Sequence, residues 1–495
     1  MTAIDNPKSK IQNRHACLVF LGCPKNQVDS EHVLGSLTEA GYSLTTDPHA
    51  ADLIVITTCA FLQSAVRESE AAIREALKHK QESPGKRIVV AGCIVERYGK
   101  SLKHKFPAVD LWVPLSDMSR IPQLLANRRS PIAIRRPPFA SRPGRSAICT
   151  RPPGLSFIPH PSSSPRVLST PSHFAYLKIA DGCDNRCSYC MIPDIRGPFH
   201  SRPMRDIVAE ARDLARAGVK ELILVAQDTT LYGTDLGGGS LLAQLLAELG
   251  KLDGIRWLRL MYTHPAHLTE DVIDEFASNP KLCRYIDLPI QHVADHLLAK
   301  MNRRYTREDV ELLLESLRAI PDIHIRTTII VGLPGETEAG FNELLAFVRA
   351  ARFDRLSCYA YSPEPGTKAT RLSGQVSPAV KKERVRRLML AQAAISRANL
   401  KQLVGRKLTV LVDSPDAENG DCTAPSQTQA LGGTVPDFPP AKNYHRRQVA
   451  VGRTEWDAPE IDGVVRLSGR KVRPGSFVQA LVTSSSTHDL TARVL

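Results

Sequence analysis

The run ADGCDNRCSYCMIPDIRG, residues 180–197, places Cys183, Cys187 and Cys190 on one short segment. No fourth cysteine lies nearby, since the next one along the chain is Cys283. A cubic 4Fe-4S cluster normally takes four cysteine ligands, so three leave one iron open to bind a further molecule, as a catalytic zinc keeps one position free. The segment therefore predicts a reactive metal centre. Two alternatives stay open: a zinc site completed by His200, and unrelated buried thiols.

The CxxxCxxC spacing with Tyr189 before the last cysteine resembles the radical S-adenosylmethionine enzymes. The resemblance implies that the open iron holds the amino and carboxylate groups of S-adenosylmethionine. One electron from the cluster then cleaves the cofactor and releases a radical that removes hydrogen from unactivated carbon. Cys183, Cys187 and Cys190 are thereby the expected catalytic residues, and Tyr189 an expected cofactor contact.

Around this segment, residues 172–403 repeat a strand–helix unit six times, which predicts a partial (β/α)6 barrel. The expected strands lie within residues 175–183, 221–230, 255–265, 284–292, 323–337 and 356–367. Functional residues of such barrels gather at the C-terminal ends of the strands. The candidates there are the three cysteines, Gln227, Asp228, His264, Gln291, His292 and Glu336.

Further cofactor contacts follow from the resemblance. Gly332, Gly335 and Glu336 in IIVGLPGETE match a glycine-rich motif of the family and are expected to let the backbone approach S-adenosylmethionine. Gln227 and Asp228 are expected at its ribose or methionine end, with a turn cap as the alternative. Arg326 pairs either the cofactor carboxylate or a buried acid. Arg196 and Arg202 orient the cysteine loop or lie at the surface, and His264 and His292 are expected to be satisfied polar groups.

Residues 14–125 alternate apolar strands with helical segments, which predicts an open parallel sheet in an α/β domain. Three expected strands end at Cys23, Cys59 and Cys93. Ligands collect at the carboxyl ends of parallel strands, so we expect the three thiols to converge on a second cluster, again with an open iron. LGCPKNQVDSE, TTCAF and VAGCI resemble the methylthiotransferase family, and GCPKN its RimO-type branch, which modifies a ribosomal protein.

The resemblance implies that two 4Fe-4S clusters and S-adenosylmethionine attach a methylthio group to the β-carbon of an aspartate in a small-subunit ribosomal protein. A reducing electron donor and a sulfur donor are implied partners. One rival function is methylthiolation of adenosine in transfer RNA, and a rival of another class is an iron–sulfur electron-transfer protein. The acidic residues Glu455, Asp457, Glu460 and Asp462 lie close together in sequence and suit a basic ribosomal protein better than a phosphate backbone.

The flanking regions complete the domain scheme. Residues 126–171 are a Pro- and Arg-rich linker, and the interval between Asp117 and Asp181 holds nine arginines and no acid. That charge leaves nucleic acid as a secondary partner. Residues 404–495 contain short strands that predict a small antiparallel β-barrel. They resemble a TRAM domain, GRTEWDAPEIDG fits a RimO-type pattern, and residues near 414–442 form a polar insertion.

Composition restricts the location of the protein. No run of 18 apolar residues exists, so no membrane span is expected, and the N-terminal stretch lacks the pattern of an export signal. Cluster ligands need free thiols, which a reducing compartment maintains. We therefore expect a cytoplasmic protein. The remaining cysteines are expected to be structural: Cys17, Cys149, Cys283, Cys358 and Cys422.

Overall fold

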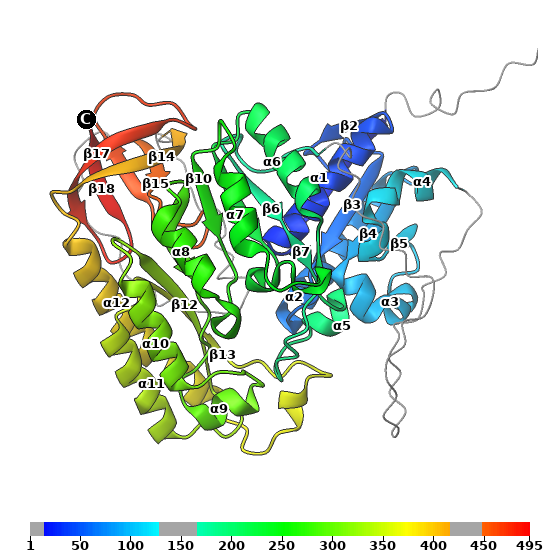
Figure 1. Cartoon of the computed structure of the whole chain (residues 1–495). Coiled ribbons are helices and arrows are strands. Elements are labelled where there is room, and N and C mark those ends of the chain that lie inside the picture. The colour runs from blue at the N-terminus through cyan, green and yellow to red at the C-terminus, as the bar shows by residue number, and fades with distance from the viewer. Residues whose placement is uncertain (1–13, 128–165, 416–447) are drawn as a thin grey trace, which may run out of the picture. The chain divides into compact units, whose positions relative to one another are not determined.

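The computed structural model describes residues 14–127, 166–415 and 448–495 (Figure 1). They form two compact units, of which the first comprises Met1–Ser169 with Asp194–Arg196 and the second comprises Thr170–Pro193 with Gly197–Leu495. Most of the expected linker and almost all of the expected polar insertion fall outside the described residues.

The N-terminal unit is built on a five-stranded parallel sheet in the order β2-β1-β3-β4-β5, which confirms the predicted open α/β layer. Its strands are β1 (Arg14–Phe20), β2 (Tyr42–Thr45), β3 (Leu53–Thr58), β4 (Arg87–Gly92) and β5 (Leu111–Val113). Its helices are α1 (Pro24–Glu39), α2 (Gln63–Glu82), α3 (Cys93–Lys105) and α4 (Ile121–Ala126). Every residue of β3 is buried, as expected for a central parallel strand covered on both faces.

The second unit contains a six-stranded parallel sheet in the order β13-β12-β11-β10-β9-β6. Its strands are β6 (Phe174–Lys178), β9 (Glu221–Val225), β10 (Trp257–Leu260), β11 (Leu282–Asp287), β12 (His324–Val331) and β13 (Arg355–Ala360). Because chain neighbours are sheet neighbours throughout, the sheet is the predicted partial barrel.

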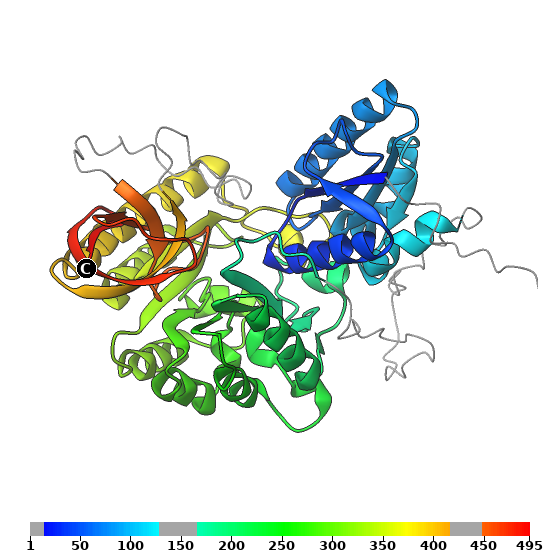
Figure 2. The ribbon, with the colours of Figure 1, turned by 90° about the horizontal axis from the view of Figure 1, so that it is seen from above.

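Helices between the strands cover the outer side of this sheet, as Figures 1 and 2 show in green and yellow-green. They are α6 (Met204–Arg216), α7 (Leu242–Gly250), α8 (Glu270–Ser278), α9 (Asp295–Lys300), α10 (Arg307–Arg318) and α11 (Glu338–Ala351). Two short strands, β7 (Ala180–Asp181) and β8 (His200–Ser201), bracket the cysteine loop and pair with each other. The five-residue helix α5 (Ile192–Arg196) follows that loop.

The long helix α12 (Pro378–Lys401) leads from the sheet to a closed five-stranded barrel. The barrel strands are β14 (Lys407–Pro415), β15 (Gln448–Arg453), β16 (Val465–Ser468), β17 (Phe477–Ser485) and β18 (Leu490–Val494). Four pairings are antiparallel, as predicted, whereas β16 and β18 pair in parallel. Its interior is apolar, with Val410, Val465 and Ala480 fully buried.

Ion pairs join this barrel to the six-stranded sheet. Arg453 on β15 binds Glu221 at the start of β9 at 2.9 Å and also Asp413. Arg326 on β12 binds Asp462 at 2.7 Å, and Arg355 at the start of β13 binds Asp457. Most of these sheet residues lie at the N-terminal ends of their strands, so the barrel packs at the end of the sheet opposite to the expected site.

The predicted acidic docking patch is therefore wrong for two of its four members. The side chain of Asp462 is fully buried, and Asp457 is 3% exposed. Both carboxylates are bound by arginines that lie more than a hundred residues away in sequence. Asp457 and Asp462 of GRTEWDAPEIDG thus serve the packing of the barrel against the sheet. Glu460 is the exposed acid of the group.

Within the described part of the chain, we find no helix both long enough and apolar enough to cross a bilayer.

Candidate functional site

The loop of Cys183, Cys187 and Cys190 begins directly after β7, near the C-terminal end of β6. Gly182 has φ +76, and a Cβ at this position would lie 1.9 Å from the carbonyl oxygen of Pro198. Glycine is therefore required where the chain enters the loop. The Cys183 amide donates to the carbonyl of Gly197 at 3.1 Å, and the Cys190 amide donates to the carbonyl of Cys187 at 3.1 Å. The first bond closes the loop at Cys183, and the second places Cys187 and Cys190 on one turn.

The protein environment does not by itself ionise the thiols of Cys183 and Cys190. Burial raises the pKa of Cys183 to about 11 and that of Cys190 to about 12. The Ile192 amide donates to the Cys190 sulfur at 3.4 Å and offsets only part of that penalty. Thiols with such pKa values become ligands when a metal displaces their protons.

The spacing of the sulfurs bears on the zinc alternative. A tetrahedral zinc with bonds of about 2.3 Å holds its sulfur ligands roughly 3.8 Å apart. Among the described residues, the triads of ligand atoms within 4.8 Å of one another are His49, His79, Glu82 and Asp228, His264, His267, and neither contains a cysteine. At least one pair among the three sulfurs therefore lies more than 4.8 Å apart, which suits a multi-iron cluster, in which each cysteine binds a different iron.

Gln227 and Asp228 follow β9 and face the cysteine loop from the sheet. One carboxylate oxygen of Asp228 accepts from Asn185 of the loop at 2.7 Å and from His267 at 2.9 Å. The other accepts from the Thr230 amide at 3.1 Å, which is the predicted turn cap. Both polar side-chain atoms of Gln227 are buried without a hydrogen-bond partner. A buried amide of this kind calls for a ligand.

The glycine-rich segment forms a tight turn between β12 and α11. Gly332 and Gly335 have φ of +77 and +87, which disfavour any other residue. The carboxylate of Glu336 accepts from the Gly332 amide, and Arg384 binds it at 3.0 Å. His292 lies 3.4 Å from the same carboxylate. Glu336 therefore closes the turn, in which Gly332 is buried and Gly335 is partly buried.

Arg326 and Tyr189 have different surroundings. The guanidinium of Arg326 is bound by Asp462 and by the Ser357 hydroxyl at 2.7 Å each, so the structure favours the buried-acid alternative over the cofactor carboxylate. The Tyr189 ring packs against the apolar cluster that contains Met301 and Leu333. Tyr189 thus anchors the loop beside the glycine-rich turn.

Of the remaining candidates on this unit, His264 has hydrogen-bonding and ring partners, Arg202 is buried rather than at the surface, and the side-chain oxygen of Gln291 is buried without a hydrogen-bond partner. His264 accepts from the Ala266 amide at 3.2 Å and stacks on His267. Burial lowers the pKa of His264 to about 2, so it stays neutral at physiological pH. Arg202 is buried and binds Glu210 at 2.7 Å and the Lys178 carbonyl at 2.6 Å, which holds the strand that follows the loop.

In the N-terminal unit, the predicted thiols lie at the carboxyl ends of their strands. Cys23 is the N-cap of α1, Cys59 follows the last residue of β3, and Cys93 begins α3 directly after β4. Asn26 links these ends, because its side chain donates to the Thr58 carbonyl at 2.9 Å and accepts from the Cys93 thiol at 3.7 Å.

The three thiols differ in acidity. Burial alone would raise the pKa of Cys23, but the positive charges of Lys25 and Arg196 and two backbone amides outweigh it and lower that pKa. Burial raises the pKa of Cys59 to about 12 and also raises that of Cys93. The pKa of Cys59 responds to both other thiols, so the three form one electrostatic group.

Sequence reasoning missed the arginines that contact these sulfurs. Arg196, in the N-terminal unit, lies 3.9 Å from the Cys93 sulfur and binds Asp29 at 3.3 Å. Arg303, in the second unit, lies 3.8 Å from the Cys187 sulfur. The sequence predicts for Arg196 either a role in orienting the loop of Cys183, Cys187 and Cys190 or a place at the surface, and neither includes a contact with Cys93. For Arg303, the MNRRYT run that contains it gives no sign of a contact with a cysteine 116 residues away.

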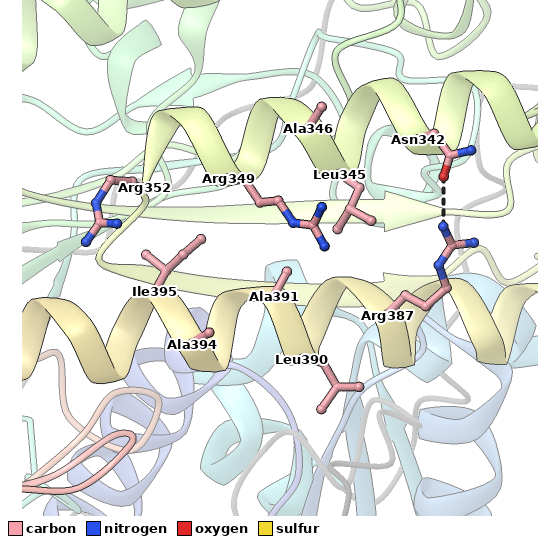
Figure 3. Close-up of a pocket in the computed structure, with 10 residues that line it drawn as sticks. All are labelled: Asn342, Leu345, Ala346, Arg349, Arg352, Arg387, Leu390, Ala391, Ala394 and Ile395. Atoms are coloured by element: carbon pink, nitrogen blue, oxygen red, sulfur yellow. Dashed lines mark hydrogen bonds between the residues drawn. The ribbon is translucent and has the colours of Figure 1, made fainter.

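A separate groove of about 810 Å³ lies between α11 and α12. Figure 3 shows Leu345 and Arg349 of α11 facing Ala391 and Ile395 of α12, with Arg387 bonded to Asn342. None of the sequence-predicted site residues lines it.

Comparison with known proteins gives matches along almost the whole chain. Residues 15–114 match an uncharacterized protein family, UPF0004, residues 177–348 match the radical SAM superfamily, and residues 443–495 match the TRAM domain. A ribosomal protein uS12 methylthiotransferase RimO of Geobacter sulfurreducens is 38% identical, over 99% of this chain and 100% of that protein. The protein of the same name from Pelotomaculum thermopropionicum is 43% identical, over 97% and 98%.

Solved structures share the fold at low identity. The radical S-adenosylmethionine methyltransferase TsrM from Kitasatospora setae matches with a TM-score of 0.53 and 17% identity, over 77% of this chain and 89% of that one. A second structure of TsrM, with cobalamin and a [4Fe-4S] cluster bound, matches with a TM-score of 0.52 and 16% identity, over 82% and 78%.

Proposed function

The chain belongs to the family of ribosomal protein uS12 methylthiotransferases (RimO), and from that membership we propose that it methylthiolates the β-carbon of an aspartate in a small-subunit ribosomal protein. The observation that carries the proposal is the pair of cysteine trios, each at the C-terminal edge of its own parallel sheet. Attaching sulfur to an unactivated carbon requires both a hydrogen-abstracting agent and a sulfur source. Two centres in one chain match those two requirements.

The residues of the second unit fit a three-cysteine cluster. Cys183, Cys187 and Cys190 would hold it, because their thiols share one loop and at least one pair of sulfurs lies more than 4.8 Å apart. Bound there, a 4Fe-4S cluster with an open iron would coordinate S-adenosylmethionine and supply the electron for its cleavage. The unpartnered side-chain amide of Gln227 and the partly exposed end of the turn at Gly335 would bind the cofactor.

The residues of the N-terminal unit fit a second cluster of the same kind. Cys23, Cys59 and Cys93 would hold it, and the positive charges of Lys25 and Arg196 would offset the negative charge of the bound thiolates. Asn26 would hold two of the ligating segments together through its bonds to Thr58 and Cys93.

The test is mass spectrometry of the modified molecule. We expect that a strain lacking this gene loses the methylthio group on the ribosomal protein, and that the wild-type gene restores it whereas the Cys183→Ala variant does not. Digested transfer RNA from the same strains serves as the second measurement. If the methylthio label disappears from adenosine in transfer RNA and persists on the protein, the RNA-directed alternative is correct.

A carrier of iron–sulfur clusters without enzymatic activity would give a different result. Reduced, reconstituted enzyme is expected to form 5'-deoxyadenosine from S-adenosylmethionine, and a pure electron carrier would not. We further propose that a reducing electron donor and a sulfur donor act as partners, since the chemistry consumes both electrons and sulfur.

A further inference from the structure

The segment Met301–Arg303, directly after α9, holds the cysteine loop of the second unit. The Ser188 amide donates to the carbonyl of Met301 at 3.0 Å. The side-chain amide of Asn302 donates to the carbonyls of Asn185 and Arg186 at 3.0 and 3.1 Å. Asn302 has φ +59, a conformation that costs energy outside glycine and that its bonds to the loop maintain. Arg303 is thereby fixed beside the Cys187 sulfur.

Arg303 is buried without an acidic partner. It is 9% exposed, its Nη2 donates to the Pro289 carbonyl at 3.0 Å, and its Nη1 contacts the Cys187 sulfur. Its Nε is buried and has no hydrogen-bond partner. Within the described ranges no carboxylate lies within ion-pair distance. Asp228 interacts with it only at longer range and is already bound by Asn185 and His267.

The other buried arginines make this absence unusual. Arg202, Arg259, Arg326, Arg384 and Arg453 each bind a carboxylate at 3.0 Å or less. Arg196, which touches the Cys93 sulfur in the N-terminal unit, is paired with Asp29. Burying a cation without a counter-charge is costly, so a conformationally fixed guanidinium of this kind calls for an anion that arrives with a ligand. A cluster bound by three thiolates carries such a negative charge.

We propose that Arg303 is the counter-charge of the cluster held by Cys183, Cys187 and Cys190, and that its contact with the Cys187 sulfur raises the reduction potential of that cluster. The inference rests on the proposed function, which supplies the cluster. Reduction adds negative charge, and a nearby positive charge with an N–H directed at a ligating sulfur stabilises the reduced state. Arg303 is a positioning residue in this sense, because it acts on the electron-accepting centre through Cys187.

The experiment compares Arg303→Gln, Arg303→Lys and the matched control Arg304→Gln in the full-length chain. Arg304 is the adjacent, exposed arginine, so its replacement removes the same charge from the surface. All variants carry Cys23→Ala, Cys59→Ala and Cys93→Ala, which leaves one centre to observe. After anaerobic reconstitution with iron and sulfide, the reduction potential is measured by electron paramagnetic resonance titration with no S-adenosylmethionine present.

We expect Arg303→Gln to disfavour reduction by about tenfold, which is about 59 mV more negative for a one-electron couple. In Arg303→Lys the reduction potential is expected to shift in the same direction by less, because lysine keeps the positive charge but lacks the planar guanidinium contacts. Arg304→Gln is expected to have the reduction potential of the parent. If Arg303→Gln takes up the cluster and its reduction potential equals that of the parent, the inference is overturned, even if the variant binds S-adenosylmethionine more weakly.

Two further outcomes are decisive. If Arg303→Gln takes up no iron, Arg303→Lys decides: a negative shift supports the inference and a parental potential overturns it. If the parent itself forms no cluster, the proposed function fails and this inference fails with it. That result differs from the one in which the variant binds the cluster with an unchanged reduction potential, which overturns the inference alone.

Discussion

Cys23 and Cys59 differ in the charge state that their surroundings favour, although both are partly exposed. The pKa of Cys23 is lowered, whereas burial raises that of Cys59 to about 12. In metal-free protein at pH 8, we therefore expect iodoacetamide to alkylate Cys23 at least about ten times faster than Cys59, since the thiolate is the nucleophile. Peptide mapping by mass spectrometry measures both rates.

The control for that prediction is Lys25→Gln, which removes a charge that lowers the pKa of Cys23. It should slow alkylation of Cys23 and leave Cys59 unaffected. Equal rates at the two cysteines in the wild-type protein would show that the charges near α1 do not govern their reactivity.

Asp462 is the second residue with a measurable individual effect. Asp462→Asn removes the carboxylate that binds Arg326 at 2.7 Å and leaves only the longer ion pair to Asp287 at 3.6 Å, so we expect a loss of about 3 kcal/mol in the free energy of unfolding. The control Glu460→Gln changes an exposed acid in the same segment and should alter stability by less than about 0.5 kcal/mol. Chemical denaturation compares the two, and similar midpoints would contradict the importance of the buried pair.

The same pair has a defined pH dependence. Burial would raise the pKa of Asp462, but Arg326 and Arg355 outweigh it and lower that pKa. Its contribution is therefore complete above the unfolded-state pKa of about 3.9 and is lost as the pH falls through the folded-state value. The stability difference between wild type and Asp462→Asn should be full at pH 7 and shrink toward pH 3.

At the scale of elements, the turn between β12 and α11 depends on its glycines. A Cβ at Gly332 would lie 2.3 Å from the Lys381 side chain, on backbone with φ +77. We expect Gly332→Ala to weaken S-adenosylmethionine binding by about tenfold, or about 1.4 kcal/mol, as the turn shifts. Isothermal titration calorimetry on the reconstituted enzyme measures the dissociation constant for S-adenosylmethionine.

Gly340 provides the matched control for that turn. It lies in the first turn of α11, and a Cβ there would lie 3.6 Å from the Thr337 hydroxyl oxygen, which is an ordinary van der Waals contact. Gly340→Ala should therefore leave binding intact and stabilise the helix by up to about 1 kcal/mol. If both substitutions weaken binding equally, the turn geometry is not the cause.

Strands and cysteines were predictable because each signal is local. Cys23, Cys59 and Cys93 directly follow apolar strands, and the GCDNRCSYC loop follows another. Arg303 and the domain-joining pairs were not, because a charged residue reads as exposed until its distant partner is known. Asp462 lies 136 residues from Arg326, and its charge indicated a docking patch where the fold has a buried contact.

At the scale of the whole molecule, the two cysteine trios are separable in sequence and belong to different units. We expect Cys23→Ala and Cys183→Ala each to lose about half of the iron and sulfide after anaerobic reconstitution, since each trio binds its own cluster. The double variant should retain almost none. Loss of all iron in either single variant would indicate one shared centre.

The salt links between the β-barrel and the six-stranded sheet also restrict how this protein can be re-engineered or can exchange parts during evolution. Arg326, Arg355 and Glu221 belong to the sheet, whereas Asp462, Asp457 and Arg453 belong to the barrel. If the barrel were replaced by that of a relative with different charges at these positions, the charged side chains of the sheet would be buried without an oppositely charged partner. We therefore expect a functional chimera to require both sets of residues to be transferred together.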